Sequence, residues 1–293
     1  METDAAAVSP VCSVVRLDSP DGTTTVVHDF GGEGPVLLFV HATGLHGWVW
    51  KPVADLLVDR AHCVAVDLRG HGDTTVATGS QISWQGLGDD VLAAANYFGT
   101  GEVIGVGHSL GGAALATAEL AAPGTFKRLY LYEPAIPVGM SDEERQSLAR
   151  VSDHMVRVAG RRRARFASRH HALANYVAKP PMAYFQAAAL DAYVSYGFSD
   201  VDDDPEAVQL KCTPQIEASI YDAVVHAPAP SVNDISCPIT VATGADSDTF
   251  EHSAAQRLAA ELAIAPVTLA GVGHFAPMES PKLFAASVAT HCL

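Results

Sequence analysis

The sequence is poor in positive charge. Among its 293 residues, 18 are lysine or arginine and 33 are aspartate or glutamate, so the formal net charge is −15. A surface of this kind repels nucleic acid over most of its area, and we therefore expect no nucleic-acid partner. We attribute the acidity to solubility, because high net charge keeps proteins apart in solution.

Long apolar runs and paired cysteines are also missing. No stretch of about 18 uncharged apolar residues occurs, which argues against a membrane span. The start, Met1-Glu2-Thr3-Asp4, has neither the positive leader nor the apolar core of a secretory signal. The five cysteines are scattered and show no Cys-x-x-Cys spacing for zinc or redox work: Cys12, Cys63, Cys212, Cys237 and Cys292. We expect a reduced, cytoplasmic compartment.

Short apolar strands alternate with helical segments along most of the chain. Residues 11–18 and 23–29 are β-branched and flank Ser19-Pro20-Asp21-Gly22, a hairpin signal that predicts an antiparallel pair. Helices are expected near residues 50–58, 83–98, 113–122, 253–262 and 281–290. Buried strands are expected near residues 36–40, 63–67, 102–104, 129–132, 239–243 and 267–270. This order predicts an open, mostly parallel sheet with helices on both faces.

The pattern changes between residues 135 and 232. This part is helical, rich in alanine and charged residues, and contains no run of five β-branched residues. We interpret it as a helical cap inserted into a core made of residues 1–134 and 233–293. Pro228-Ala229-Pro230-Ser231 is expected to mark the exit from the cap.

The strongest chemical signal is Gly107-x-Ser109-x-Gly111, which lies between a predicted strand and a predicted helix. This is the nucleophile-elbow pattern, in which a tight turn exposes a strained serine at the top of a sheet. Glycine two residues before and after the serine avoids collisions with the neighbouring strand and helix. Ser109 is therefore the candidate nucleophile.

A serine hydroxyl needs a neutral histidine to accept its proton and an acid to orient that histidine. His274 lies just past the last predicted strand and is the candidate base. For the acid, the loop after residues 239–243 offers Asp248, which we prefer, and Asp246. Glu133, at the end of the neighbouring strand, is a third candidate.

The negative charge that develops on the carbonyl oxygen needs two backbone N–H donors. Leu110, at the start of the helix after the serine, should supply one. Thr43, in the loop after residues 36–40, should supply the other. We expect His41 to brace that loop rather than to perform chemistry, and His71 and His108 to be structural as well.

Four motifs in this order resemble those of the α/β-hydrolase family, across essentially the whole chain. They are His41-x-x-Gly44, Asp67-x-Arg69-Gly70-x-Gly72, Gly107-His108-Ser109-Leu110-Gly111-Gly112 and Gly273-His274-x-x-Pro277-x-Glu279-x-Pro281. The resemblance implies the α/β-hydrolase fold, with an eight-stranded, mostly parallel sheet and a helical cap after the sixth strand. It also implies a triad of Ser109, His274 and an acid, with Thr43 and Leu110 in the oxyanion hole.

Two positions depart from the family pattern. Ala42 stands where the family often has glycine, and the acid motif Gly-x-x-Asp places Ser247 at the acid position. Members with one extra loop residue would align their acid with Asp248. Serine at 109 disfavours the family's epoxide hydrolases and haloalkane dehalogenases, which use an aspartate there to form an alkyl ester.

The cap offers the only clue to the substrate. Its aromatic residues, with two tryptophans near the oxyanion loop, predict an apolar pocket that accepts aromatic groups: Tyr176, Met182, Tyr184, Phe185, Tyr193, Tyr196, Trp48 and Trp50. Arg161-Arg162-Arg163-x-Arg165, with Arg169, is either a solvated helix face or a site for a substrate anion. Asp200–Asp204 lacks the glycine and distal glutamate of an EF-hand, so we interpret it as a solvated loop.

Together these residues predict a serine hydrolase that cleaves a carboxylic ester or lactone through an acyl-enzyme, with no metal or organic cofactor. The expected partner is a small, apolar or aromatic ester. A carbon–carbon bond hydrolase or a cofactor-free perhydrolase is possible on the same scaffold, because the fold does not fix the reaction. A ligand receptor that retains the triad without turnover is the alternative from another class.

Overall fold

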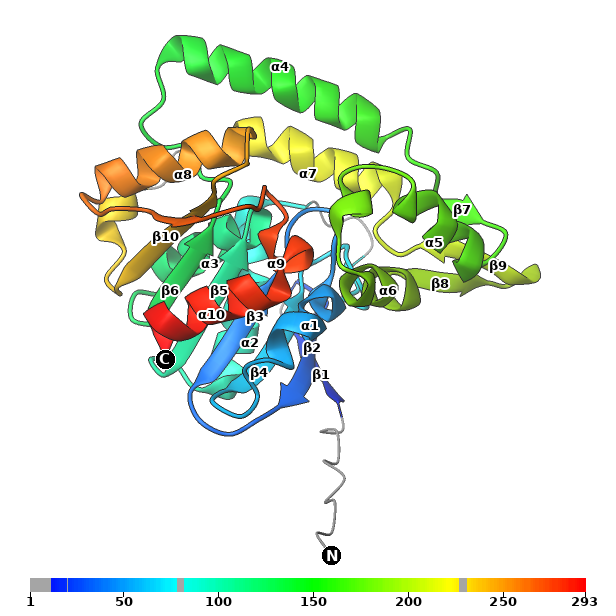
Figure 1. Cartoon of the computed structure of the whole chain (residues 1–293), viewed down its shortest axis with the longest axis horizontal. Coiled ribbons are helices and arrows are strands. Elements are labelled where there is room, and N and C mark those ends of the chain that lie inside the picture. Colours follow the sequence, from blue (N-terminus) through cyan, green and yellow to red (C-terminus); the bar gives the residue numbers. More distant parts are fainter. Residues whose placement is uncertain (1–11, 20, 78–81, 227–230) are drawn as a thin grey trace, which may run out of the picture.

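Figure 1 shows the computed structural model of the chain, which describes residues 12–19, 21–77, 82–226 and 231–293. The expectations for Met1-Glu2-Thr3-Asp4 and for Pro228-Ala229-Pro230 lie outside these residues. The main sheet has eight strands in the order β1-β2-β4-β3-β5-β6-β10-β11. Their bounds are β1 Ser13–Asp18, β2 Thr24–Gly31, β3 Val36–Val40, β4 His62–Asp67, β5 Val103–His108, β6 Phe126–Tyr132, β10 Ile239–Gly244 and β11 Val267–Leu269.

The sheet confirms the predicted architecture. β2 pairs antiparallel with β1 on one side and with β4 on the other, and all the other pairs of this sheet are parallel. The central strands are buried on both faces, which explains why they lack the alternation of a half-exposed strand. Because these parallel strands run the same way, the loops after β3, β5, β6, β10 and β11 gather at one edge of the sheet.

Helices cover both faces of the sheet, and each face has its own apolar core. α2 (Trp84–Phe98), α3 (Leu110–Ala121) and α8 (Phe250–Glu261) pack on one face. η1 (Gly47–Trp50), α1 (Lys51–Ala54) and α10 (Pro281–Cys292) pack on the other, where Trp50 stacks on Phe39. The short α9 (Ala276–Glu279) precedes α10.

The chain leaves the sheet at Tyr132 and returns at Ile239. The elements between these points are α4 (Asp142–Ala159), β7 (Arg165–Phe166), α5 (Arg169–Val177), η2 (Met182–Tyr184), α6 (Ala187–Tyr196), β8 (Phe198–Val201), β9 (Asp204–Leu210), α7 (Pro214–His226) and η3 (Val232–Asp234). The limits of the cap, residues 135–232, stay a prediction.

This part of the chain contains strands as well as helices, because β7, β9 and β8 form a small antiparallel sheet that the sequence did not indicate. β9 has the sequence Asp-Pro-Glu-Ala-Val-Gln-Leu, with one β-branched residue, and therefore gives little strand signal. Its pairing follows from tertiary packing, since Leu210 lies opposite Phe198 and both side chains are buried. Context of this kind overrides β propensity.

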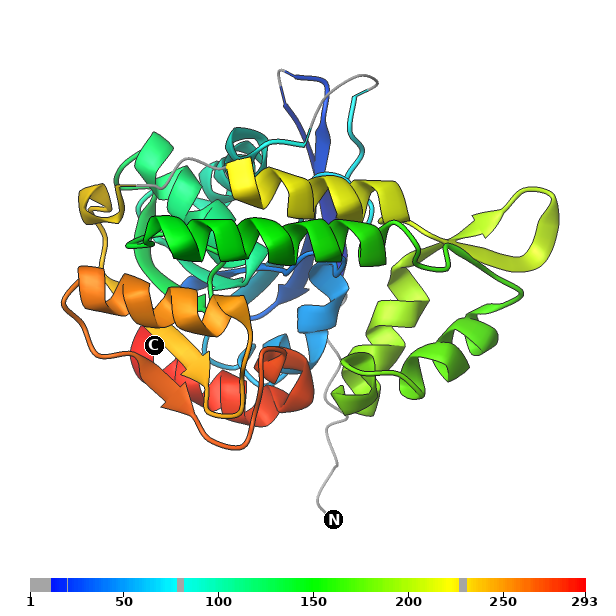
Figure 2. The ribbon, with the colours of Figure 1, turned by 90° about the horizontal axis from the view of Figure 1, so that it is seen from above.

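α4 and α7 lie side by side above the edge of the sheet where the strands end, in both views (Figures 1 and 2). Ser152 Oγ on α4 donates a hydrogen bond to the Tyr221 carbonyl on α7 over 2.6 Å. The start of α4 is fixed by a capping box, in which Ser141 and Glu144 bond each other's backbone N–H. Within the described ranges, no helix has both the length and the apolar character needed to cross a membrane.

Candidate active site

Ser109 lies in the turn between β5 and α3. Its φ of 53° is in the left-handed region, which is strained for a residue with a side chain. A Cβ at Gly107 would lie 2.7 Å from the Gly112 Cα, and a Cβ at Gly111 would lie 2.1 Å from the Val40 carbonyl oxygen. The turn therefore has the steric requirements that the glycine spacing indicated.

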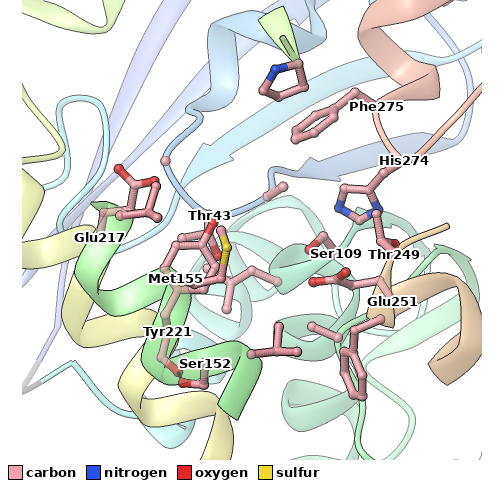
Figure 3. A pocket seen from close by; sticks show the side chains of 18 of the residues that line it. Thr43, Ser109, Ser152, Met155, Glu217, Tyr221, Thr249, Glu251, His274 and Phe275 are labelled. Carbon is pink, nitrogen blue, oxygen red and sulfur yellow. Dashed lines mark hydrogen bonds between the residues drawn. The ribbon is translucent and has the colours of Figure 1, made fainter. Parts of the chain in front are cut away.

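His274 lies in the loop between β11 and α9, and its side chain is 10% exposed. Its Nδ1 lies 2.7 Å from Glu133 Oε2, at the end of β6. A carboxylate accepts, so Nδ1 carries the proton and Nε2 is left as the basic nitrogen. Figure 3 shows His274 and Ser109 facing the same cavity, which both residues line.

No hydrogen bond joins the side chains of Ser109 and His274 in the described structure. Catalytic hydrogen bonds are often long or poorly aligned until substrate tightens the site, so this does not count against the pair. The arrangement contains the parts of a serine nucleophile with a base whose tautomer is fixed.

Glu133 is fully buried and accepts hydrogen bonds on both carboxylate oxygens. The donors besides His274 lie at the end of β10, in the loop that follows it and in the first turn of α8: Gly244 N at 2.9 Å, Ser247 Oγ at 2.8 Å, Thr249 Oγ1 at 3.4 Å and His252 Nδ1 at 3.3 Å. Burial alone would raise the pKa of Glu133, but the contacts with His274 and these donors lower it. Glu133 is therefore held as a charged group.

The same contact acts on His274. Burial alone would lower the pKa of His274, but the hydrogen bond that it donates to Glu133 and the negative charges of Glu251, Glu133 and Glu279 raise it overall. Removing the Glu133 carboxylate would leave the imidazolium buried without its closest counter-charge.

The preference for Asp248 as the partner of His274 does not agree with this geometry, since Glu133 holds that position. Asp248 and Asp246 are both exposed, and neither hydrogen-bonds His274 in the described structure. Asp248 lines the cavity nearby. The loop after β10 turns its serine and threonine hydroxyls toward Glu133, and this leaves its aspartates in solvent. Ser247, where Gly-x-x-Asp would place the acid, is one of the donors to Glu133.

Two signals read together favour Glu133, the third of the candidates that the sequence offered. One is a carboxylate directly after an apolar strand, and the other is a serine in place of the acid of the neighbouring loop. Each signal is weak by itself, because many strands end in a charged residue.

Leu110 is the first residue of α3, so its N–H has no partner within the helix and points out of the N-terminus. Thr43 follows β3, and both residues line the same cavity as Ser109; Figure 3 labels Thr43 and Ser109 in it. Their role as oxyanion donors stays a prediction.

Two buried histidines hold the loop that carries Thr43, as predicted. His41 Nε2 accepts the Leu68 N–H at 3.0 Å, and its Nδ1 bonds the Ala42 carbonyl at 2.8 Å. His71 Nε2 accepts the Gly44 N–H at 3.1 Å. An accepting nitrogen must be unprotonated, so both rings must be neutral. Burial favours this state and lowers the pKa of His71 to about 4.

His108 has a different environment. It is fully buried, and its ring centroid lies 4.7 Å from that of His274. Burial lowers its pKa well below the ordinary value. It forms part of the packing beneath His274.

The cavity has a volume of about 1180 Å³ and lies between the sheet edge and the cap. Only Tyr176 and Met182 of the predicted aromatic wall line it. Trp50 is in the core, Trp48 stacks on Tyr196 at 3.8 Å, and Tyr184 is 65% exposed. The remaining predicted wall residues are buried beside the cavity, Phe185 against Phe275 and Tyr193 through a hydrogen bond from Arg162. Four further apolar residues of the lining belong to α4.

The arginine cluster divides into two groups. Arg161, Arg162 and Arg163 line the cavity, and Arg162 pairs with Glu217 beside Gly44. The other two are at the surface, where Arg165 pairs with Asp203 at 3.0 Å and Arg169 with Asp200 at 2.7 Å. Two arginines thus pair with the acidic loop. The described residues include no group of three or more side chains arranged to hold a metal ion.

Comparison with known proteins gives the family. Residues 37–287 match the model described as the alpha/beta hydrolase family. Protein phosphatase methylesterase 1 of Mus musculus is 36% identical over 105 residues, which are 34% of this chain and 27% of that protein. 2-(Acetamidomethylene)succinate hydrolase of Mesorhizobium japonicum is 37% identical over 81 residues, which are 27% of this chain and 28% of that protein. The chain thus matches only about a quarter of the length of each of these relatives.

Solved structures agree at the level of the fold. The structure of E-2-(acetamidomethylene)succinate hydrolase has a TM-score of 0.76 at 21% identity and covers 95% of this chain and 98% of that one. The thioesterase domain from the curacin biosynthetic pathway has a TM-score of 0.73 at 19% identity and covers 95% of this chain and 99% of that one. With the sheet order and the family match, the conclusion is plain: the chain belongs to the alpha/beta hydrolase family.

Proposed function

We propose that the protein is a serine hydrolase that cleaves a carboxylic ester or lactone with Ser109 as nucleophile, His274 as base and Glu133 as acid. The observation that carries the proposal is the buried Glu133, 2.7 Å from His274, beside a strained serine in the same cavity. The relatives that are named a methylesterase and a succinate hydrolase support a hydrolytic reaction.

The proposed reaction has two halves. His274 Nε2 takes the proton of Ser109 as its oxygen attacks the carbonyl carbon, and the negative oxygen of the intermediate accepts from the Leu110 and Thr43 N–H groups. His274 then gives its proton to the leaving alcohol, and an acyl-enzyme remains on Ser109. Water, deprotonated by His274, releases the acid and restores the serine. Glu133 stabilises the imidazolium in both halves.

The decisive test is the intact mass after treatment with a reactive fluorophosphonate, for the wild-type chain and Ser109→Ala. We expect one adduct on the wild type and none on the variant, followed by multiple turnovers in an ester and lactone screen. A folded wild type without an adduct would contradict the proposal and favour the receptor alternative. Formation of a carboxylic acid from a vinylogous diketone, but from no ester, would favour carbon–carbon bond hydrolysis, and peroxide-dependent halogenation would favour a perhydrolase.

A second candidate is an ester that itself carries a carboxylate. Arg161 and Lys179 line the cavity, and neither pairs with a carboxylate in the described structure. Arg161→Ala should then lower kcat/KM for a hemisuccinate ester more than for the matching neutral ester. Arg165→Ala, whose side chain pairs with Asp203 at the surface, is the control. Equal effects on both esters would exclude this candidate.

A further inference from the structure

Four apolar residues on one face of α4 line the cavity. They are Leu148, Val151, Met155 and Val158, and we call them the α4 stripe. Their spacing of three, four and three residues puts them on one side of the helix. At a rise of about 1.5 Å per residue, the stripe is about 15 Å long. The cavity thus has an apolar wall much longer than a single acetyl group.

Protein covers only about half of two residues of the stripe. Val151 is 46% exposed and Val158 is 47% exposed, although both face a concave site. α4 is anchored elsewhere: Ser152 and Ala159 are buried, and Ser152 bonds the backbone of α7. The contact between α4 and α7 therefore does not require the two valines. Apolar surface that stays open inside a pocket is typical of a ligand-binding wall.

The stripe is continuous with the catalytic groups. Ser109, His274 and the four residues line one cavity, and Figure 3 shows Met155 across the cavity from Ser109. Met140 and Phe250 add apolar surface to the same wall system. A chain attached to the carbonyl carbon at Ser109 can therefore reach the stripe without leaving the cavity.

Charged groups bound the apolar part at both ends of α4. Glu144 and Arg257 pair at the N-terminal end at 3.2 Å, and Arg161 and Arg162 line the cavity beyond the C-terminal end. Burying these groups against a methylene chain would be unfavourable. The apolar length is therefore limited to the stripe itself, and this favours a chain of medium length.

We propose that the α4 stripe binds the extended apolar acyl chain of the substrate, so that the enzyme prefers medium-chain aliphatic acyl esters over acetyl esters. This inference rests on the proposed function and adds the substrate class to it. Each methylene that enters the groove should raise kcat/KM between two- and fourfold, and fourfold corresponds to about 0.8 kcal/mol per buried methylene. The gain should stop where the chain meets the charged end.

The test measures kcat/KM for nitrophenyl acetate, butyrate, hexanoate, octanoate, decanoate and laurate. In the wild type we expect a rise to the medium chains and then a plateau or a fall. In Val151→Asp/Val158→Asp the loss should grow with chain length, because each added methylene then lies beside a carboxylate. Met155→Trp, which fills the groove without adding charge, should shorten the best substrate.

Val14→Asp is the matched control, because Val14 is 48% exposed on β1 and does not line the cavity. It should keep the wild-type dependence on chain length. A flat wild-type profile, or a double variant that keeps the wild-type slope, would overturn the inference while leaving the proposed function intact.

If no ester is turned over and Ser109 forms no fluorophosphonate adduct, the proposed function fails and a binding measurement decides about the stripe. The probe is dansyl-undecanoic acid, whose fluorescence rises in apolar surroundings. Binding to the wild type that is lost in the double variant, but not in Val14→Asp, would support an acyl-chain site. Equal binding to all three proteins, or binding to none, would overturn it.

Discussion

Replacing Glu133 with glutamine tests which carboxylate serves His274. The change keeps the shape of the side chain but removes its charge and turns one acceptor into a donor. The amide nitrogen can then face His274 Nδ1 only if Nδ1 loses its proton, and this moves the proton to Nε2, the nitrogen that must accept from Ser109. In serine hydrolases the wrong tautomer is known to cost about 10⁴ in kcat.

We therefore expect Glu133→Gln to lower kcat by a factor of about 10³–10⁴, or about 4–5.5 kcal/mol in the activation barrier. Asp248→Asn should change kcat by less than about threefold, because its carboxylate is exposed and does not bond His274. The assay is steady-state hydrolysis of the best ester in the screen, with thermal unfolding of each variant as the folding control. A large loss in Asp248→Asn beside an active Glu133→Gln would refute the assignment.

A double variant sharpens this test. Ser247 Oγ lies 2.8 Å from Glu133 Oε2, and residue 247 is where the family motif places the acid. An aspartate there should reach His274 when residue 133 no longer carries a charge. Adding Ser247→Asp to Glu133→Gln should therefore raise kcat about tenfold or more above that of Glu133→Gln alone. No recovery in a folded double variant would mean that this loop cannot turn a carboxylate toward His274.

Four further predictions concern this pair and the loops around it. His274 must be neutral to act as base, and Glu133 raises its pKa above the ordinary 6.5, so kcat/KM should be half-maximal above pH 6.5. The lowered pKa of Glu133 stabilises the fold above about pH 4.5, and the raised pKa of His274 does so below about pH 6.5. Melting temperatures of wild type and Glu133→Gln should thus differ most between these values. His71→Phe should lower kcat about 10- to 100-fold with little change in KM, because Gly44 loses its acceptor and the oxyanion loop shifts. Gly111→Ala should lower the melting temperature by about 5 °C or more, since its Cβ would meet the Val40 carbonyl at 2.1 Å.

The fold was predictable because its central strands are uninterrupted apolar runs that the sequence shows directly. Uninterrupted apolar runs such as Val36–Val40 have one stable environment, the middle of a sheet covered on both faces. The elbow was predictable because its glycine spacing is a recognisable pattern: a Cβ at Gly107 would meet the backbone of Gly112, and one at Gly111 would meet the backbone of Val40. Steric requirements of this kind leave a short motif in the sequence.

The cap was less predictable because its contacts are between distant segments. Tyr193 could not be excluded from the cavity wall without knowing that Arg162, 31 residues away, bonds its hydroxyl. β9 likewise becomes a strand through its partners rather than through its own residues. The α4 stripe, by contrast, is visible in the spacing of Leu148, Val151, Met155 and Val158, but the sequence does not say which face of α4 meets α7 and which meets the cavity.

The carboxylate that bonds His274 is the feature that the sequence could least predict. β6 and β10 are parallel neighbours, with Tyr132 opposite Ala242, so a carboxylate that follows either strand starts within reach of His274. Motif spacing cannot decide between them. The choice depends on which carboxylate finds enough donors to stay charged when it is buried, and that requires the loop contacts of Ser247, Thr249 and His252 with Glu133. A serine at the usual acid position is then part of the arrangement, because an aspartate at residue 247 would place a second negative charge against Glu133. The two positions therefore exclude each other as carboxylates, which is why the double variant should work only after residue 133 has lost its charge.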